Sequence, residues 1–146
     1  QVECTFFARS ARQGVLAISD LEQKISSFDA VVLILPLTSE TRHLITSTEL
    51  ANMKPGGLLV NLARGPVVKT DDLLVALKTG KISAAIDVTD PEPLPSDHEL
   101  WRLPNVVISP HVGGNSSAFE PQAREFLEQQ LARYVATGEL VNEIEF

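Results

Sequence analysis

The chain has 146 residues, of which 44% are hydrophobic, and it carries a formal net charge of −7 at pH 7. The length suits one domain or most of one, and the apolar share is sufficient for a buried core. The acidic balance argues against a nucleic-acid partner, because binding to a phosphate backbone requires basic patches.

Two further features limit where the protein works. No apolar run reaches the roughly 18 residues that a membrane-spanning helix needs. The one cysteine, Cys4, cannot form a disulfide within the chain. We therefore expect a cytoplasmic protein with no membrane partner, in which Cys4 packs in the core as a small apolar residue.

Apolar runs and helix signals alternate along the chain. The predicted elements, in chain order, are a strand (2–8), a helix (19–26), a strand (29–37), a helix (46–54), a strand (58–63), a helix (70–80), two strands (83–88 and 105–110) and a long helix (116–138). Strands separated by short helices are typical of βαβ units, so we expect an α/β fold with a parallel sheet.

Local signals support these elements. Ser19 with Glu22, and Thr46 with Glu49, have the spacing of capping boxes at helix starts, and Gly80 is expected to follow a helix end. The strands 29–37 and 58–63 are continuous apolar runs, which is typical of strands buried on both faces of a sheet.

Polar residues at the ends of the predicted strands are the candidates for a functional site, because parallel sheets bind ligands at the carboxyl ends of their strands. These residues are Arg9, Thr38, Arg64, Asp87, Glu92 and His111, and the apolar Pro36 lies at the same strand end as Thr38. A guanidinium, two carboxylates and an imidazole at one sheet edge are sufficient for acid–base chemistry on an anionic substrate.

Two segments, "NLARGPVV…DLLVALKTGKISAAIDVTDPEPLP" and "LWRLPNVVISPHVGG", carry a family resemblance. They resemble the nucleotide-binding domain of the D-2-hydroxyacid dehydrogenases, most of all the glyoxylate/hydroxypyruvate reductases. The resemblance extends from about residue 2 to residue 145. It implies a Rossmann-type doubly wound parallel sheet and NAD(P)H-dependent reduction of a small 2-keto acid to the D-2-hydroxy acid.

The resemblance also implies the roles of three catalytic residues. Arg64 would bind the carboxylate and the keto oxygen of the substrate, which a planar guanidinium can do with two hydrogen bonds. His111 would donate a proton to the keto oxygen, and Glu92 would pair with His111. Structural roles stay open for each: Arg64 could bind loop carbonyls, His111 the backbone, and Glu92 only water.

Cofactor contacts follow from the same resemblance. Asp87 would hydrogen-bond the nicotinamide carboxamide, although it could also merely cap a strand end. The other residues implied at the cofactor are Pro36, Thr38, Ala63, Gly113 and Gly114. Arg9, Ser10 and Arg12 stand where NAD-specific folds place an acidic residue, so they favour the 2′-phosphate of NADP, with NAD as the alternative. Arg9 and Arg12 could instead be surface charges.

Other functions fit the same residues. One is an NAD-dependent dehydrogenase of the phosphoglycerate or D-lactate type, against which Arg9 and Arg12 argue. Another is a non-catalytic, corepressor-like module that senses NAD(H), and a third is an inactive fragment. His43, His98 and Trp101 are predicted to have structural roles, although Trp101 could line the substrate pocket.

The chain departs from the family pattern at one point, because it contains no G-x-G-x-x-G. In the family this turn joins the central first strand to a helix whose amides hold the pyrophosphate. We therefore expect residues 1–114 to be the C-terminal part of the dinucleotide-binding domain. Residues 115–146 would pack on a substrate lobe that is supplied by the same polypeptide or by another chain. The resemblance also implies a homodimer, because members of the family are commonly dimers. Without the first strand the sheet should split.

Overall fold

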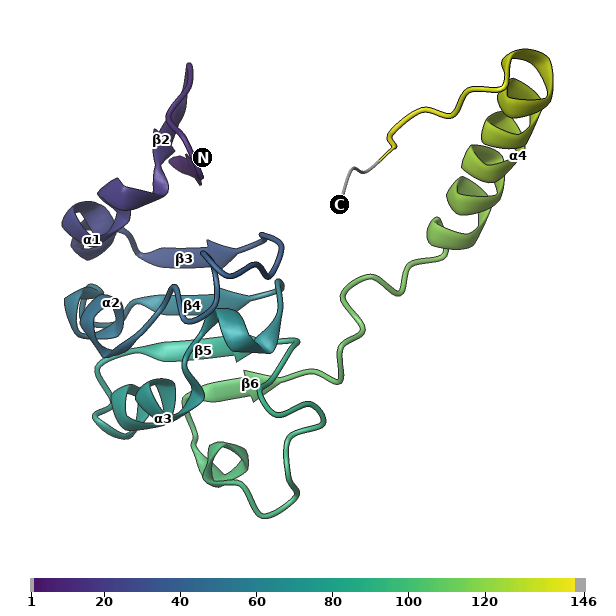
Figure 1. Cartoon of the computed structure of the whole chain (residues 1–146). Coiled ribbons are helices and arrows are strands. Elements are labelled where there is room, and N and C mark those ends of the chain that lie inside the picture. Colours follow the sequence, from purple (N-terminus) through teal and green to yellow (C-terminus); the bar gives the residue numbers. More distant parts are fainter. Residues whose placement is uncertain (1, 144–146) are drawn as a thin grey trace. The chain divides into compact units, whose positions relative to one another are not determined.

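The computed structural model describes residues 2–143, which divide between His111 and Val112 into two compact units. The first unit contains two parallel sheets (Figure 1). The smaller sheet pairs β1 (Phe6–Ala8) with β2 (Val15–Ala17). The larger sheet has the order β3 (Ala30–Leu33), β4 (Leu58–Asn61), β5 (Ser83–Ile86) and β6 (Val106–Ile108). The predicted α/β class with parallel strands is confirmed.

The two sheets are separate. Within residues 2–143, no backbone pairing joins β1 to β3. The strand β2 was not predicted, and β1 begins only at Phe6. Cys4 therefore lies outside the strand and is exposed, so the prediction that it packs in the core is wrong.

Short helices connect the strands of the first unit. They are η1 (Ile18–Asp20), α1 (Leu21–Lys24), η2 (Ile25–Ser27), α2 (Ser47–Asn52), η3 (Gly65–Val67), α3 (Thr70–Lys78) and η4 (Glu99–Arg102). The Thr46–Glu49 capping box is confirmed: the Glu49 carboxylate accepts the Thr46 N–H at 2.8 Å. The prediction of a capping box at Ser19 is wrong, because α1 begins after Asp20 without a side-chain cap. Gly80 follows the end of α3 with φ +72°, as predicted.

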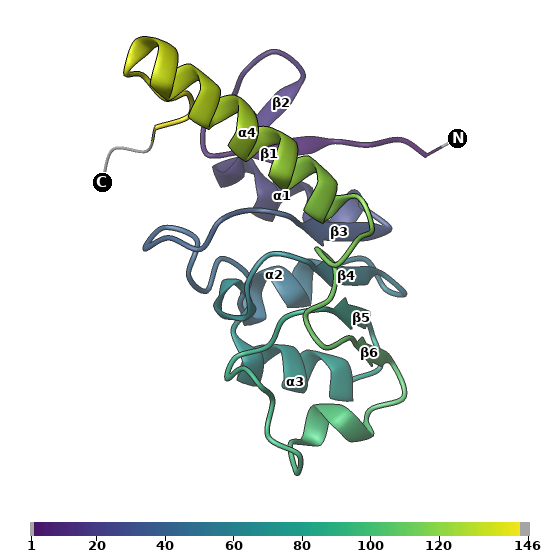
Figure 2. The same cartoon turned by 90° about the vertical axis from the view of Figure 1, so that its right-hand side faces the viewer.

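The helices α2 and α3 lie on the same face of the larger sheet (Figures 1 and 2). Leu50 of α2 and Leu73 of α3 are buried in one core with Leu59 of β4. The opposite face is open: Val32 is 51% exposed and Ile34 is 75% exposed. The prediction that 29–37 is buried on both faces is therefore wrong, because no helix within residues 2–111 covers the second face.

The second unit contains α4 (Phe119–Thr137), which Gly138 ends in a left-handed conformation with φ +73°. No residue of α4 is buried. Its large apolar side chains, all at least 44% exposed, are Phe119, Phe126, Leu127, Leu131, Tyr134 and Val135. None of the helices within residues 2–143 is both long and apolar enough to cross a membrane.

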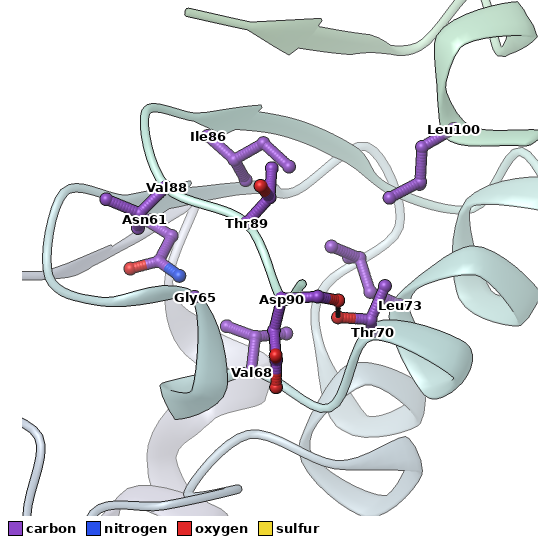
Figure 3. A pocket seen from close by; sticks show the side chains of 10 residues that line it. All are labelled: Asn61, Gly65, Val68, Thr70, Leu73, Ile86, Val88, Thr89, Asp90 and Leu100. Atoms are coloured by element: carbon purple, nitrogen blue, oxygen red, sulfur yellow. Dashed lines mark hydrogen bonds between the residues drawn. The ribbon is translucent and has the colours of Figure 1, made fainter. Parts of the chain in front are cut away.

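A tight contact joins the turn after β4 to the segment after β5. A Cβ atom on Gly65 would lie 1.8 Å from the carbonyl oxygen of Thr89, so only glycine fits between the two backbones. Nearby, the Thr70 hydroxyl donates to the carbonyl oxygen of Asp90 at 2.7 Å. Figure 3 shows these residues around a cavity of about 10 Å³. This volume is at the lower limit for one water molecule, so the cavity is a packing gap and not a ligand site.

Replacing Gly65 tests this contact. In Gly65→Ala the new methyl group must push the two backbones apart, which should lower the free energy of unfolding by about 1–3 kcal/mol or more. Urea denaturation of the protein expressed from its complete gene measures this change. Gly114→Ala is the control, because a Cβ at Gly114 meets no atom within 4 Å. Equal unfolding midpoints for the two variants would show that Gly65 is not tightly packed.

Candidate functional site

The carboxyl ends of β4, β5 and β6 meet at one edge of the larger sheet. Asn61, Ile86 and Ile108 are the last paired residues of these strands and lie in register. Arg64 and His111 each stand three residues beyond the last pair, and Asp87 follows Ile86 directly. Parallel pairing therefore brings residues that are far apart in the sequence to the same edge, as predicted from the strand ends.

His111 and Glu92 form a direct pair at this edge. The His111 Nδ1 atom lies 2.6 Å from Glu92 Oε1, and the two side chains are 46% and 39% exposed. An ionised carboxylate only accepts hydrogen bonds, so Nδ1 carries the hydrogen and donates it to Glu92. The ring is thus oriented with Nε2 as the nitrogen that can exchange a proton with a bound molecule.

The backbone of His111 is also unusual. Its φ angle of +54° is in the left-handed region, which few residues other than glycine adopt. Strained backbone of this kind is concentrated at functional sites, where the surrounding structure holds it in place. The conformation and the bond to Glu92 together make His111 a candidate site residue.

Arg64 is the N-terminal cap residue of η3, directly before the close contact at Gly65. One nitrogen of its guanidinium, Nη1, donates to the carbonyl oxygen of Ala63 at 2.7 Å. A guanidinium has five N–H donors, so this bond is compatible with a second, bidentate contact to a carboxylate. The exposed side chain therefore combines a structural bond with the capacity to bind an anion.

Asn61 shapes the turn that carries Arg64, and the sequence analysis missed it. The residue is 1% exposed. Its Nδ2 atom donates to the carbonyl oxygen of Arg64 at 3.1 Å, and its Oδ1 atom accepts the N–H of Ala63 at 3.0 Å. One amide side chain thus holds both backbone groups beside Arg64. The available signal was a single polar residue in the apolar run "LLVNLA".

Asp87 is a buried carboxylate, 5% exposed, at the end of β5. The hydroxyl of Ser109 donates to its Oδ1 atom at 2.5 Å, and its backbone N–H donates to the carbonyl oxygen of Asn61 at 3.0 Å. Ser109 was not among the predicted site residues, although it directly precedes Pro110 and His111. One side-chain bond, from Ser109 to Asp87, and one backbone bond, from Asp87 to Asn61, therefore link the ends of three neighbouring strands.

A groove of about 550 Å³ lies at the carboxyl ends of β3 and β4. The side chains that line it are apolar except for one cation, and they belong to Ile34, Leu35, Pro36, Leu37, Leu62, Ala63 and Arg64. Such a groove suits a ligand with apolar rings and an anionic end. The predicted cofactor residues Pro36 and Ala63 are thus part of one groove with Arg64.

Thr38 lies in a turn next to the groove. Its backbone N–H donates to the hydroxyl of Thr41 at 2.7 Å, and that hydroxyl donates to the carbonyl oxygen of Pro36 at 2.7 Å. The groove and the buried Asp87 carboxylate fit the ring-bearing parts of a dinucleotide. The chain contains no glycine-rich turn with the spacing that holds a pyrophosphate.

The basic segment after β1 has a partner that the sequence analysis did not foresee. Arg9 Nη2 lies 2.7 Å from Glu40 Oε1, and the two side chains are 82% and 58% exposed. Ser10 is exposed as well, and the backbone of Arg12 forms a bridge to Val15. An acidic side chain therefore does stand beside Arg9, although it comes from the loop after β3.

The remaining predicted residues lie elsewhere. Gly113 and Gly114 belong to the second unit, so their place at the cofactor remains a prediction. His98 Nδ1 accepts the N–H of Leu100 at the start of η4, and Trp101, which is 50% exposed, donates from Nε1 to the carbonyl oxygen of Pro95. His43 has φ +53°, and its N–H donates to the carbonyl oxygen of Pro66.

Known proteins resemble the chain in both sequence and structure. Glyoxylate/hydroxypyruvate reductase B of Citrobacter koseri is 48% identical over 95 residues, which are 64% of this chain and 29% of that protein. A D-isomer specific 2-hydroxyacid dehydrogenase of Xanthobacter autotrophicus Py2, solved with NADPH and MES, superposes with a TM-score of 0.82 at 33% identity. This match covers 95% of our chain and 59% of that one.

Phosphoglycerate dehydrogenase of Lactobacillus plantarum superposes with a TM-score of 0.72 at 32% identity, over 95% of this chain and 47% of that one. The chain thus spans less than two thirds of each of these relatives. Residues 4–113 match the family model described as D-isomer specific 2-hydroxyacid dehydrogenase, NAD binding domain. The chain belongs to the D-isomer specific 2-hydroxyacid dehydrogenase family, and its residues 4–113 correspond to the NAD-binding domain of that family.

Proposed function

We propose that this chain carries the proton donor and the substrate-binding arginine of an NAD(P)H-dependent reductase of small 2-keto acids such as glyoxylate or hydroxypyruvate. The observation that supports this most directly is the 2.6 Å pair of His111 and Glu92 at the sheet edge that also bears Arg64. The similarity to glyoxylate/hydroxypyruvate reductase B supports the substrate class.

Arg64 would bind the substrate. Its guanidinium can hold the carboxylate of a 2-keto acid through two parallel hydrogen bonds, which also orients the neighbouring keto group. Asn61 fixes the backbone on both sides of this guanidinium, so the turn is already in place when the substrate arrives.

His111 would protonate the keto oxygen from Nε2. Glu92 keeps Nδ1 engaged and stabilises the positive charge of the protonated ring, which is the form that can donate. When bound, the reduced nicotinamide supplies the hydride for the keto carbon. Asp87 would hold the carboxamide of that ring, and the groove at Pro36 and Ala63 would hold the rest of the cofactor.

We also propose a preference for NADPH, because Arg9, Ser10 and Arg12 can bind a 2′-phosphate. The Arg9–Glu40 pair moderates this preference, since Glu40 competes for the guanidinium and repels a phosphate. Glu40 is also the specific observation that favours the second candidate, an NAD-dependent dehydrogenase of the phosphoglycerate or D-lactate type. A carboxylate near Arg9 could accept the ribose 2′-hydroxyl of NAD.

Arg64→Ala should sharply reduce reduction of glyoxylate, because the substrate loses a charge-assisted, bidentate contact. The expected loss in kcat/KM corresponds to about 2–5 kcal/mol. NADPH oxidation by the protein expressed from its complete gene provides the measurement. Arg102→Ala is the matched control, because Arg102, at the end of η4, lines neither the small cavity beside Gly65 nor the groove at Arg64. Unchanged turnover in Arg64→Ala would refute the role of Arg64.

Glu92→Gln should lower kcat for glyoxylate by about 10- to 100-fold and leave KM for glyoxylate within a few-fold. The amide can still accept the Nδ1 hydrogen, but it cannot stabilise the charged imidazole. His111→Ala should lower kcat for glyoxylate by at least the same factor. Asp97→Asn, an exposed acid in the same loop, is the control. A Glu92→Gln enzyme with the original kcat would exclude the carboxylate from catalysis.

Substitutions at Arg9 and Glu40 should change NADPH binding in opposite directions. Arg9→Ala should raise KM for NADPH by about 10-fold or more, whereas Glu40→Gln should lower it by up to about 5-fold, the range of an exposed ion pair. KM for NADH should change little in Arg9→Ala. Asp29→Asn, which breaks the exposed pair with Lys54, is the control. Equal effects of Arg9→Ala on both cofactors would contradict a 2′-phosphate site.

A further inference from the structure

Ser109 connects two strand ends of the site, and no catalytic role accounts for it. Its backbone N–H donates to Ile86 of β5 at 3.0 Å, and its hydroxyl donates to Asp87 Oδ1 at 2.5 Å. The first bond extends the pairing of β5 and β6, whereas the second is made by the side chain alone. This second bond therefore depends on the residue type at position 109.

The bond fixes the direction of a buried carboxylate. Asp87 is 5% exposed, so water contributes little to holding its side chain. A hydroxyl that donates to an ionised carboxylate makes a short, strong hydrogen bond, which favours one rotamer of the acceptor. Asp87 is thus held in one orientation before any ligand binds, which lowers the entropic cost of binding.

A carboxylate held in this way can recognise an N–H donor. Within a nicotinamide ring, the carboxamide is the group that carries N–H donors, whereas the ring itself has none. We propose that Ser109 is a positioning residue, which acts through Asp87 to select the carboxamide of the nicotinamide. This inference rests on the proposed function, in which Asp87 contacts that group.

A pair of cofactors that differ only in this donor separates positioning from general packing. Reduced 3-acetylpyridine adenine dinucleotide phosphate has a methyl ketone where NADPH has the carboxamide, so it cannot donate an N–H to Asp87. Fluorescence titration of both reduced dinucleotides gives their Kd values without any turnover. The two dinucleotides differ only in this group, so a change in the ratio of their Kd values in an Asp87 or Ser109 variant reports the contacts of the carboxamide.

We expect Ser109→Ala to raise Kd for NADPH by about 10-fold, and to change Kd for the acetylpyridine analogue by less than about 2-fold. Ser109→Thr keeps the hydroxyl and should restore both Kd values. Ser109→Cys has a weaker donor, so its Kd for NADPH should lie between those of the parent protein and Ser109→Ala. This variant still tests the inference if the alanine variant does not fold. Ser83→Ala, at the opposite end of β5, should leave both values unchanged.

The outcomes distinguish the inference from the proposed function. If the parent protein prefers NADPH over the analogue and Ser109→Ala keeps that preference, the positioning role of Ser109 is refuted. The proposed contact of Asp87 with the carboxamide is not affected by this result. If Ser109→Ala weakens both dinucleotides equally, its effect is general packing and the inference is wrong. If the parent protein and Asp87→Ala both bind the two dinucleotides equally, the role of Asp87 fails and the inference fails with it.

Discussion

The candidate site depends on the parallel, in-register pairing of β4, β5 and β6. Because these strands end together, Arg64, Asp87 and His111 reach one edge although 47 residues separate the first from the last. Hydrogen bonds along this edge then fix the local geometry. Asn61 holds the turn of Arg64, its carbonyl oxygen accepts the N–H of Asp87, and Ser109 holds the Asp87 carboxylate.

Backbone contacts place the second carboxylate. The absence of a side chain at Gly65 lets the turn after β4 lie against Thr89, and the Thr70 hydroxyl bonds Asp90. These contacts fix the segment that leads to Glu92. The Glu92 carboxylate then meets His111, whose backbone has a left-handed conformation. The acid–base pair is therefore assembled from two loops that are each attached to the same core.

The packing is strong on one face of the sheet and open on the other. Leu50, Leu73 and Leu59 form a core between the helices and the sheet, while Val32 and Ile34 are exposed on the other face. Within the residues that the structure describes, β3 is an edge strand of the larger sheet and pairs with β4 alone. The same chain thus contains a well-packed frame for the site residues and surfaces whose sequence is typical of a buried interior.

The α/β class, most of the elements and the strand-end residues could be predicted from the sequence, because they depend on local periodicity, on caps and on the rule that parallel strands carry sites at their ends. The Thr46 cap and Gly80 are examples of such local signals. The sequence did not reveal β2, the partner of Arg9, or the roles of Asn61 and Ser109. The partner of Arg9 and the role of Ser109 depend on contacts between segments that are distant in the chain, Arg9 with Glu40 and the end of β5 with the end of β6. The bonds of Asn61 are local, but an apolar run does not show which turn its one polar side chain will hold. Exposure of Val32 was likewise decided by which helices cover the sheet, and no apolar run contains that information.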